Sequence, residues 1–188
     1  MKLTPRQKFS RALNQVMRDD PFLATILMKL KHIESDDCPS LMRTDGKMLE
    51  FNPKMLDERT QQDIEFILKH EAFHVANGHN IRQRVLYDAL KQSAQFGQKL
   101  RDLGLDQQDL HMMHNVACDL AVNELLRMNR EYVPEDALIV GANGYAGFQR
   151  NKSSEHYFMK LFDQEEEEQS KKKQKVIVTG KRYSFSCI

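Results

Sequence analysis

Two histidines near the middle of the chain are spaced to bind one metal ion. Residues 70–74 read His-Glu-Ala-Phe-His, an HExxH motif inside a stretch with helical apolar spacing. On a helix, residues i and i+4 lie on one face, so His70 and His74 can point two imidazoles at the same ion. Glu71 lies beside them and can take a proton from a water activated by that ion. Because zinc lowers the pKa of such a water to about 7, the motif predicts zinc-assisted hydrolysis with Glu71 as the general base and acid.

A catalytic zinc site needs a third protein ligand, and the best candidate lies on a later helix. Asn115, Asp119 and Asn123 are spaced at i, i+4 and i+8, so they share one face of a helix predicted over residues 109–128. A carboxylate turned toward a core needs a counter-charge, which a zinc ion supplies. We therefore predict Asp119 as the third ligand, with Asn115 and Asn123 orienting the ligands through hydrogen bonds.

The residues alone leave other arrangements of this site open. The Asn-Asp-Asn stripe is also the pattern of a solvated helix face. His79 follows His74 by five residues, so it can reach the ion only if the chain turns back at Gly78. His111 and His114 could also ligate, but both are expected at the rim of the cleft or on the surface. The further candidates for the third ligand are His79, His114 and Glu124.

Composition narrows the class of protein. A length of 188 residues with 40% hydrophobic residues suits one packed domain, and a net charge of +1 gives no basic field for nucleic acid. No apolar run approaches the ~18 residues that a membrane-spanning helix needs. The cysteines Cys38, Cys118 and Cys187 are odd in number and far apart, which argues against a disulfide framework. We expect a cytoplasmic protein with no nucleic-acid or membrane partner; the sequence leaves its oligomeric state open.

The spacing of apolar residues predicts a mainly helical chain with one small hairpin. The pair Asp45-Gly46 is a strong turn signal between two short candidate strands, 40–44 and 48–51. Thr60, with Asp63 three residues later, marks the start of the helix that carries the motif. The predicted fold class is therefore α+β, mainly α-helical, with a small β-sheet or hairpin. The helices expected are 4–18, 21–30, 60–77, 80–103, 109–128, and one from Ser154 to about Phe162.

The composition changes at residue 164. Residues 165–168 are acidic and residues 171–173 are basic, a pattern typical of a solvated helix end or linker. Residues 176–178 can form one strand, but too few residues follow for a second domain. We predict one domain over residues 1–163, followed by a charged linker and short tail over residues 164–188.

Taken in order, these features resemble the putative metallopeptidase domain found N-terminal to von Willebrand factor A-like domains in predicted metal-dependent peptidases. The resemblance covers roughly residues 4–162 and implies a zincin-like fold with one zinc ion, held by His70, His74 and Asp119, and with Glu71 as the catalytic residue. In longer relatives a second domain follows, whereas this chain ends soon after the charged linker. The matching pieces are Pro21-Phe22-Leu23-Ala24, Thr44-Asp45-Gly46, Asn52-Pro53, residues 70–74 with Gly78-His79, residues 115–123, Pro134, and Ser154-Glu155 with Tyr157.

These observations favour a zinc-dependent peptidase that acts on a peptide or protein substrate. The predicted hairpin can offer an edge strand to which an extended peptide adds. The loop over residues 141–148 can cover the cleft, with Tyr145 as a donor to an oxyanion. The alternative is a domain that keeps the fold and the metal without useful turnover and acts as an adaptor or regulator; the intact Glu71 favours the enzyme. A nucleic-acid-binding protein with a structural zinc ion agrees poorly with this sequence, since structural zinc sites take four Cys or His ligands.

Overall fold

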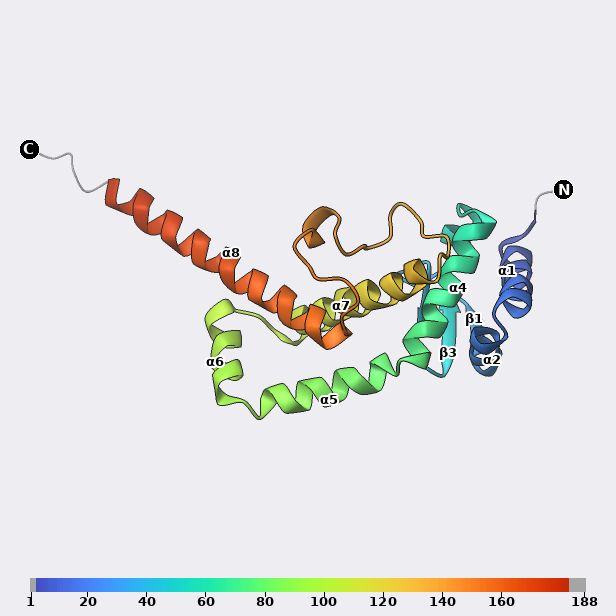
Figure 1. The fold of residues 1–188 in the computed structure, drawn as a ribbon, viewed down its shortest axis with the longest axis horizontal. Coiled ribbons are helices and arrows are strands. Elements are labelled where there is room, and N and C mark those ends of the chain that lie inside the picture. The colour runs from blue at the N-terminus through green and yellow to red at the C-terminus, as the bar shows by residue number, and fades with distance from the viewer. Residues whose placement is uncertain (1–2, 183–188) are drawn as a thin grey trace, which may run out of the picture.

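The chain is mostly helical, with one small sheet among the residues that the structure describes (Figure 1). The computed structural model describes residues 3–182, and the side chains of all of these except Asn143 and residues 172–182. The predicted class, α+β and mainly helical, is confirmed. None of the described helices combines the length and apolarity that crossing a bilayer requires. The elements are α1 Pro5–Asp19, α2 Pro21–Lys29, β1 Lys31–Glu34, β2 Met42–Thr44, β3 Met48–Phe51, α3 Pro53–Asp57, α4 Gln61–Ala76, α5 His79–Lys91, α6 Ala94–Leu103, α7 Gln107–Met128, a 3-10 turn Asn143–Tyr145, and α8 Ser154–Arg182.

The sheet has the order β1-β3-β2, which leaves β2 at one edge. The predicted hairpin is confirmed, because β2 and β3 pair antiparallel around the turn at residues 44–47. Gly46 takes a φ of +86°, where a side chain is strained, and the Asp45 carboxylate accepts from the backbone N–H groups of Lys47 and Met48 at 2.8 and 2.7 Å. The sequence did not reveal β1, which pairs parallel to β3.

Helix α4 positions the motif and is capped as the sequence predicts. Thr60 and Asp63 form a capping box, with the Asp63 N–H donating to the Thr60 hydroxyl at 3.2 Å and the Thr60 N–H donating to the Asp63 carboxylate at 3.0 Å. A buried stripe at helical spacing then packs α4 against the sheet and α1. Gly78, in the left-handed region with a φ of +62°, follows the end of α4 and reverses the chain into α5.

The apolar side chains form two cores and a small cluster between them. The N-terminal core joins α1 to α4 and the sheet, whereas the C-terminal core joins α5 to α8 with the loop before α8. A bridging cluster of Phe66, Val122 and Leu126 connects α4 to α7. The two histidines of the motif therefore belong to the helix of one core, and the predicted third ligand to a helix of the other.

Two predicted boundaries in the middle of the chain are wrong. The helix expected over residues 80–103 is two helices, because Ser93 accepts from the Phe96 N–H at 3.2 Å and caps α6. Helix α7 begins at Gln107 instead of Asp109, because Asp106 forms its capping box with Asp109.

The last helix does not end near Phe162, and residues 176–178 are not a strand. Helix α8 continues to Arg182 and extends away from the rest of the molecule (Figure 1). The run from residue 163 to 175 contains no Gly or Pro, and opposite charges one turn apart support the helix, as at Glu167 and Lys171, 3.6 Å apart. A domain boundary at residue 163 stays a prediction, and Cys187 lies outside the described residues.

Candidate metal centre

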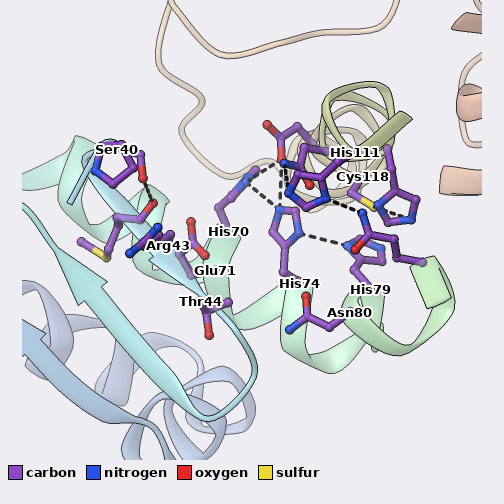
Figure 2. Close-up of a pocket in the computed structure, with 16 residues that line it drawn as sticks. Ser40, Arg43, Thr44, His70, Glu71, His74, His79, Asn80, His111 and Cys118 are labelled. Atoms are coloured by element: carbon purple, nitrogen blue, oxygen red, sulfur yellow. Dashed lines mark hydrogen bonds and ion pairs between the residues drawn. The ribbon is translucent and has the colours of Figure 1, made fainter. Parts of the chain in front are cut away.

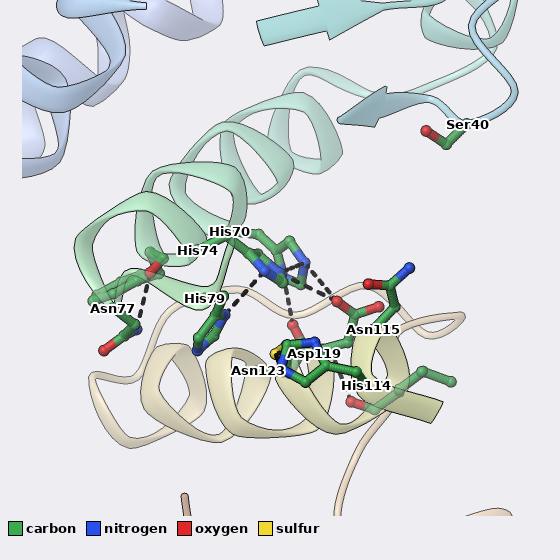
Figure 3. A network of polar contacts seen from close by, with 12 residues as sticks. Ser40, His70, His74, Asn77, His79, His114, Asn115, Asp119 and Asn123 are labelled. Atoms are coloured by element: carbon green, nitrogen blue, oxygen red, sulfur yellow. Dashed lines mark hydrogen bonds and ion pairs between the residues drawn. The ribbon is translucent and has the colours of Figure 1, made fainter. Parts of the chain in front are cut away.

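Helices α4 and α7 bring the two motif histidines and Asp119 together (Figure 3). The Nε2 atoms of His70 and His74 lie 2.8 Å apart, and the Asp119 Oδ1 atom lies 3.4 and 3.2 Å from them. Zinc holds such ligands at about 2.0–2.2 Å, which places tetrahedral ligands ~3.3 Å from one another. The three atoms are therefore spaced to close around one ion with little movement. Among the described residues, His70, His74 and Asp119 form the group of His, Cys, Asp or Glu side chains that could hold a metal ion.

His70 is held from the opposite helix. Its Nδ1 atom lies 2.8 Å from the Oδ1 atom of Asn123, and the Asn123 amide donates to the Leu138 carbonyl at 2.9 Å. The amide orientation leaves Oδ1 as the acceptor, so His70 Nδ1 carries the proton and Nε2 is free for an ion. The prediction that Asn123 orients a ligand agrees with this contact.

His74 is held from behind by His79. The turn at Gly78 swings His79 back, and its Nδ1 atom lies 3.1 Å from Nδ1 of His74. Burial, together with the nearby His74, lowers the pKa of His79 to about 3, so His79 is neutral and can accept a hydrogen bond from His74 Nδ1–H. His79 thus contacts the outer nitrogen of a candidate ligand and leaves the inner nitrogen facing Asp119.

The charges of the cluster balance one another. Burial opposes ionisation of Asp119, but hydrogen bonds from His70 and His74 outweigh it and lower the pKa of Asp119 well below its usual range. For His70, burial lowers the pKa, and the hydrogen bond and charge of Asp119 reverse this and raise it. The site therefore holds an anionic carboxylate against two imidazoles, a donor set in which a divalent cation can take the place of bound protons.

Glu71 lies on the adjacent face of α4, directed toward β2 (Figure 2). It is buried, and this burial raises the pKa of its carboxyl group, while His70 and His74 act in the opposite direction. A backbone hydrogen bond from Thr44 also contacts it. A carboxylate with a raised pKa, beside a candidate metal site and in a cleft, has the properties of a general base.

The comparison with protein families agrees with these residues. The model of the family described as putative metallopeptidase domain matches residues 4–187. The chain belongs to this family. No curated protein and no solved structure matches this chain. Family membership and the His-His-Asp cluster together indicate a metal ion in this metallopeptidase-family domain. An association with a following von Willebrand A-like domain stays a prediction.

The metal centre of this metallopeptidase-family domain opens into a cleft of about 510 Å³ lined by residues of β2, α4, α5 and α7 (Figure 2). Strand β2 forms one wall. The Asp45 N–H donates to the Met48 carbonyl, and Arg43 lies opposite Glu50 in the ladder. Because hydrogen bonding alternates along an antiparallel pair, the backbone groups of Met42 and Thr44 point away from β3, toward the open edge. The cleft is therefore bordered by the edge of β2 that pairs with no strand, although Ser40 bonds to the Met42 carbonyl and Glu71 bonds to the Thr44 backbone there.

The other residues predicted for the site do not join the ligands. Asn115 lies on the predicted face but is exposed, and its amide lies 3.3 Å from His111 on the same helix, so its role in orienting a ligand stays a prediction. His111 is exposed at the cleft rim, as expected, and lies 2.7 Å from the Gln83 amide.

The remaining candidate ligands have partners of their own. His114 is buried and not at the rim or on the surface as expected; its Nδ1 atom lies 3.5 Å from the Cys118 thiol, and burial lowers its pKa to about 4. Glu124 is buried with its Oε1 atom 3.6 Å from Arg127. Tyr145 packs edge-on against Phe148, and burial with the charge of Asp119 raises its pKa.

Sequence reasoning missed two contributors to the site. The contact of His79 with His74 depends on the left-handed turn at Gly78, and the glycine was the signal that the chain could reverse there. The contact of Thr44 with Glu71 depends on how β2 lies over α4, which no local pattern reveals.

Proposed function

We propose that the protein is a zinc-dependent peptidase that hydrolyses peptide bonds, with His70, His74 and Asp119 as zinc ligands and Glu71 as general base and acid. One observation carries this proposal. The ligand atoms of the three residues converge within 3.4 Å of one another beside the buried Glu71 carboxylate, on the floor of an open cleft.

The donor set suits zinc. Two imidazoles and one carboxylate are the ligands of many catalytic zinc sites, and they leave a fourth position for water or substrate. When bound, zinc polarises the substrate carbonyl and makes a water nucleophilic near neutral pH. The imidazole orientations support the same assignment, because Asn123 and His79 engage the outer nitrogen atoms and leave both Nε2 atoms near Asp119, where the three residues would hold the ion.

Glu71 performs the proton transfers in this proposal. Its carboxylate accepts a proton from the attacking water and returns it to the amine that leaves when the peptide bond breaks. The raised pKa of Glu71 makes it a stronger base than an exposed glutamate, and the Thr44 backbone fixes its direction. No other carboxylate lines both the cleft and the ligand cluster among the described residues except the ligand Asp119.

The edge of β2 supports a peptide as substrate. An extended peptide can add to this edge by pairing with the backbone groups of Met42 and Thr44, beside Glu71. The Ser40 hydroxyl bonds to the Met42 carbonyl at 2.9 Å and the Thr44 backbone bonds to Glu71, so a peptide pairs with the remaining backbone groups of this edge or displaces the Ser40 hydroxyl. Two buried free cysteines, Cys38 and Cys118, suit a reducing compartment, so we propose that the substrate is cytoplasmic.

Metal content and turnover of matched variants test the proposal. We expect about one zinc per wild-type chain, loss of zinc in Asp119→Ala, and retention in Asn115→Ala, which changes the same face of α7 outside the cluster. Glu71→Gln is expected to keep zinc and lose turnover of a randomised fluorogenic peptide library by about 10³-fold or more.

Three outcomes contradict the proposal. If Asp119→Ala retains zinc, Asp119 is not the third ligand. If Glu71→Gln retains activity, Glu71 does not transfer the protons. A zinc-loaded wild type that cleaves no library peptide while binding peptides favours the adaptor function, which keeps the metal without turnover.

A further inference from the structure

A second hollow, of about 520 Å³, adjoins the metal cleft at the turn end of β2. His74, His79 and Asn80 line both spaces, so the two are adjacent. The walls of the second hollow are the β2–β3 turn on one side and the first turns of α5 on the other. Its remaining lining residues are Asp45, Gly46, Lys47, Val75, Gly78, Ile81, Arg84, Val85 and Asp88.

The α5 side of this hollow carries exposed apolar side chains. Ile81 is 71% exposed and Val85 is 64% exposed, and their spacing of i and i+4 places them side by side on α5. Val75 from α4 adds a third apolar side chain. Single exposed apolar residues are ordinary, and Phe22, 66% exposed on α2, is an example outside the hollow. The α5 pair differs because both residues line a space that also contains a candidate metal ligand.

Strand β2 and the turn after it run from the metal cleft to the second hollow. Residues 42–44 line the metal cleft, and the turn residues 45–47 that follow them line the second hollow. A peptide paired with the edge of β2 therefore runs from Glu71 toward α5, with alternate side chains directed to opposite faces. The charged residues at the rim include both signs, so the hollow offers no net charge to select a charged side chain.

We propose that this hollow is a specificity subsite for a bulky apolar side chain of the substrate, on the side of the scissile bond that lies over the β2–β3 turn. Ile81 and Val85 are its specificity-determining residues. The inference rests on the proposed function, because it requires a peptide along β2. It goes further by stating the class of residue that the peptide carries.

Binding to an inactive variant tests the subsite separately from turnover. The host is zinc-loaded Glu71→Gln, and the probes are fluorescent peptides that carry Leu, Ala, Glu or Lys at each position in turn, measured by anisotropy. Ile81→Glu and Val85→Glu are made in this host, and Phe22→Glu is the matched control with the same chemical change. All three positions are highly exposed, so folding is preserved in each variant.

We expect one position at which Leu binds about tenfold more tightly than Ala, because an apolar side chain leaves water there. Ile81→Glu and Val85→Glu remove this preference and improve binding of the Lys peptide, whereas Phe22→Glu changes neither. No preference at any position, a preference that survives both α5 variants, or no binding of any peptide overturns the inference. Cleavage by the Glu71-intact protein is measured in parallel. A Leu preference without cleavage rejects the proposed peptidase and retains the subsite, and cleavage without a preference rejects the subsite alone.

Discussion

The two cores are built differently, and the candidate metal centre lies where they meet. The N-terminal core packs helices against a sheet, and the C-terminal core packs helices against one another and a long loop. His70 and His74 come from α4, on the N-terminal side, and Asp119 comes from α7, on the C-terminal side. A bound ion would therefore crosslink the two cores, and its affinity depends on how firmly they are held together.

Apolar packing and polar side-chain pairs join the two cores. The bridging cluster supplies the apolar contact, and His70 contacts Asn123 of α7. Three further polar pairs connect α4 and Arg59, two residues before it, to the chain after α7. Lys69 is buried and binds Glu131, whose side chain solvent reaches, at 2.7 Å. The other two pairs are Asp63 with Tyr132 and Arg59 with Asp136, both at 2.8 Å.

Removal of the ion is expected to have the largest effect on the joined structure. At a zinc concentration ~1,000 times the dissociation constant, binding stabilises the fold by about 4 kcal/mol. Thermal unfolding of wild type should shift upward with zinc and back with a chelator, and the shift should vanish in Asp119→Ala. Asn115→Ala is the control that keeps it. Equal unfolding temperatures with zinc and with chelator would contradict a crosslink between the cores.

A cavity in the bridging cluster should weaken stability and metal binding together. Leu126→Ala is expected to destabilise the fold by about 3 kcal/mol, because Leu126 is 1% exposed. Leu23→Ala in the N-terminal core removes an equally buried side chain and should cost a similar amount. Zinc titration of both folded variants distinguishes them. Weaker zinc binding is expected in Leu126→Ala alone. Equal affinities would show that the contacts between the two cores (the joint) do not affect zinc affinity.

The difference between the cores also explains which features the sequence could predict. The motif, the capping box of α4 and the helical position of Asp119 follow from spacing within one helix, and the structure brings the three candidate ligands together. The hairpin likewise followed from the Asp45-Gly46 turn. Local periodicity was sufficient for these features because each depends on residues a few positions apart.

Features that depend on contacts between elements were not predictable. Strand β1 lacks a turn signal and exists through its pairing with β3, which lies between it and β2. Asn115 has the same spacing from Asp119 as Asn123, yet only Asn123 reaches a ligand. The spacing places both on one face, but the crossing of α7 with α4 determines which of them faces His70. The continuation of α8 beyond Phe162 was missed because charge runs were interpreted as a linker.

His70 and His74 are oriented from different sides, and this offers a sharper test of how the contacts between the two cores affect the site. His70 relies on Asn123 from α7, whereas His74 relies on His79 from the turn after its own helix. His79→Phe keeps an aromatic ring but removes the acceptor, and we expect zinc affinity to fall about 10- to 100-fold. His79→Gln, which retains an acceptor, should restore part of it. A loss in His79→Phe that His79→Gln does not restore, with altered unfolding, would assign His79 to packing alone.

The smallest expected effect concerns Asp63, which caps α4 and also binds across the joint. Burial tends to raise the pKa of Asp63, but hydrogen bonds from Thr60 and Tyr132 outweigh this and lower it. Because the folded pKa lies below the unfolded one, Asp63 stabilises the fold at neutral pH, and this contribution is lost as the pH falls through the folded pKa. Asp63→Asn should therefore lower the free energy of unfolding by about 1 kcal/mol near pH 7, and the difference from wild type should shrink in acid.

Tyr132→Phe separates the two roles of Asp63, because it removes the bond across the joint at 2.8 Å and leaves the cap intact. Urea unfolding of both variants across the acid range measures the division. If Tyr132→Phe reproduces most of the loss in Asp63→Asn, the carboxylate acts mainly between the cores. If it reproduces little, the carboxylate acts mainly as the cap of the helix that carries the motif, and the joint depends on the bridging cluster and the ion.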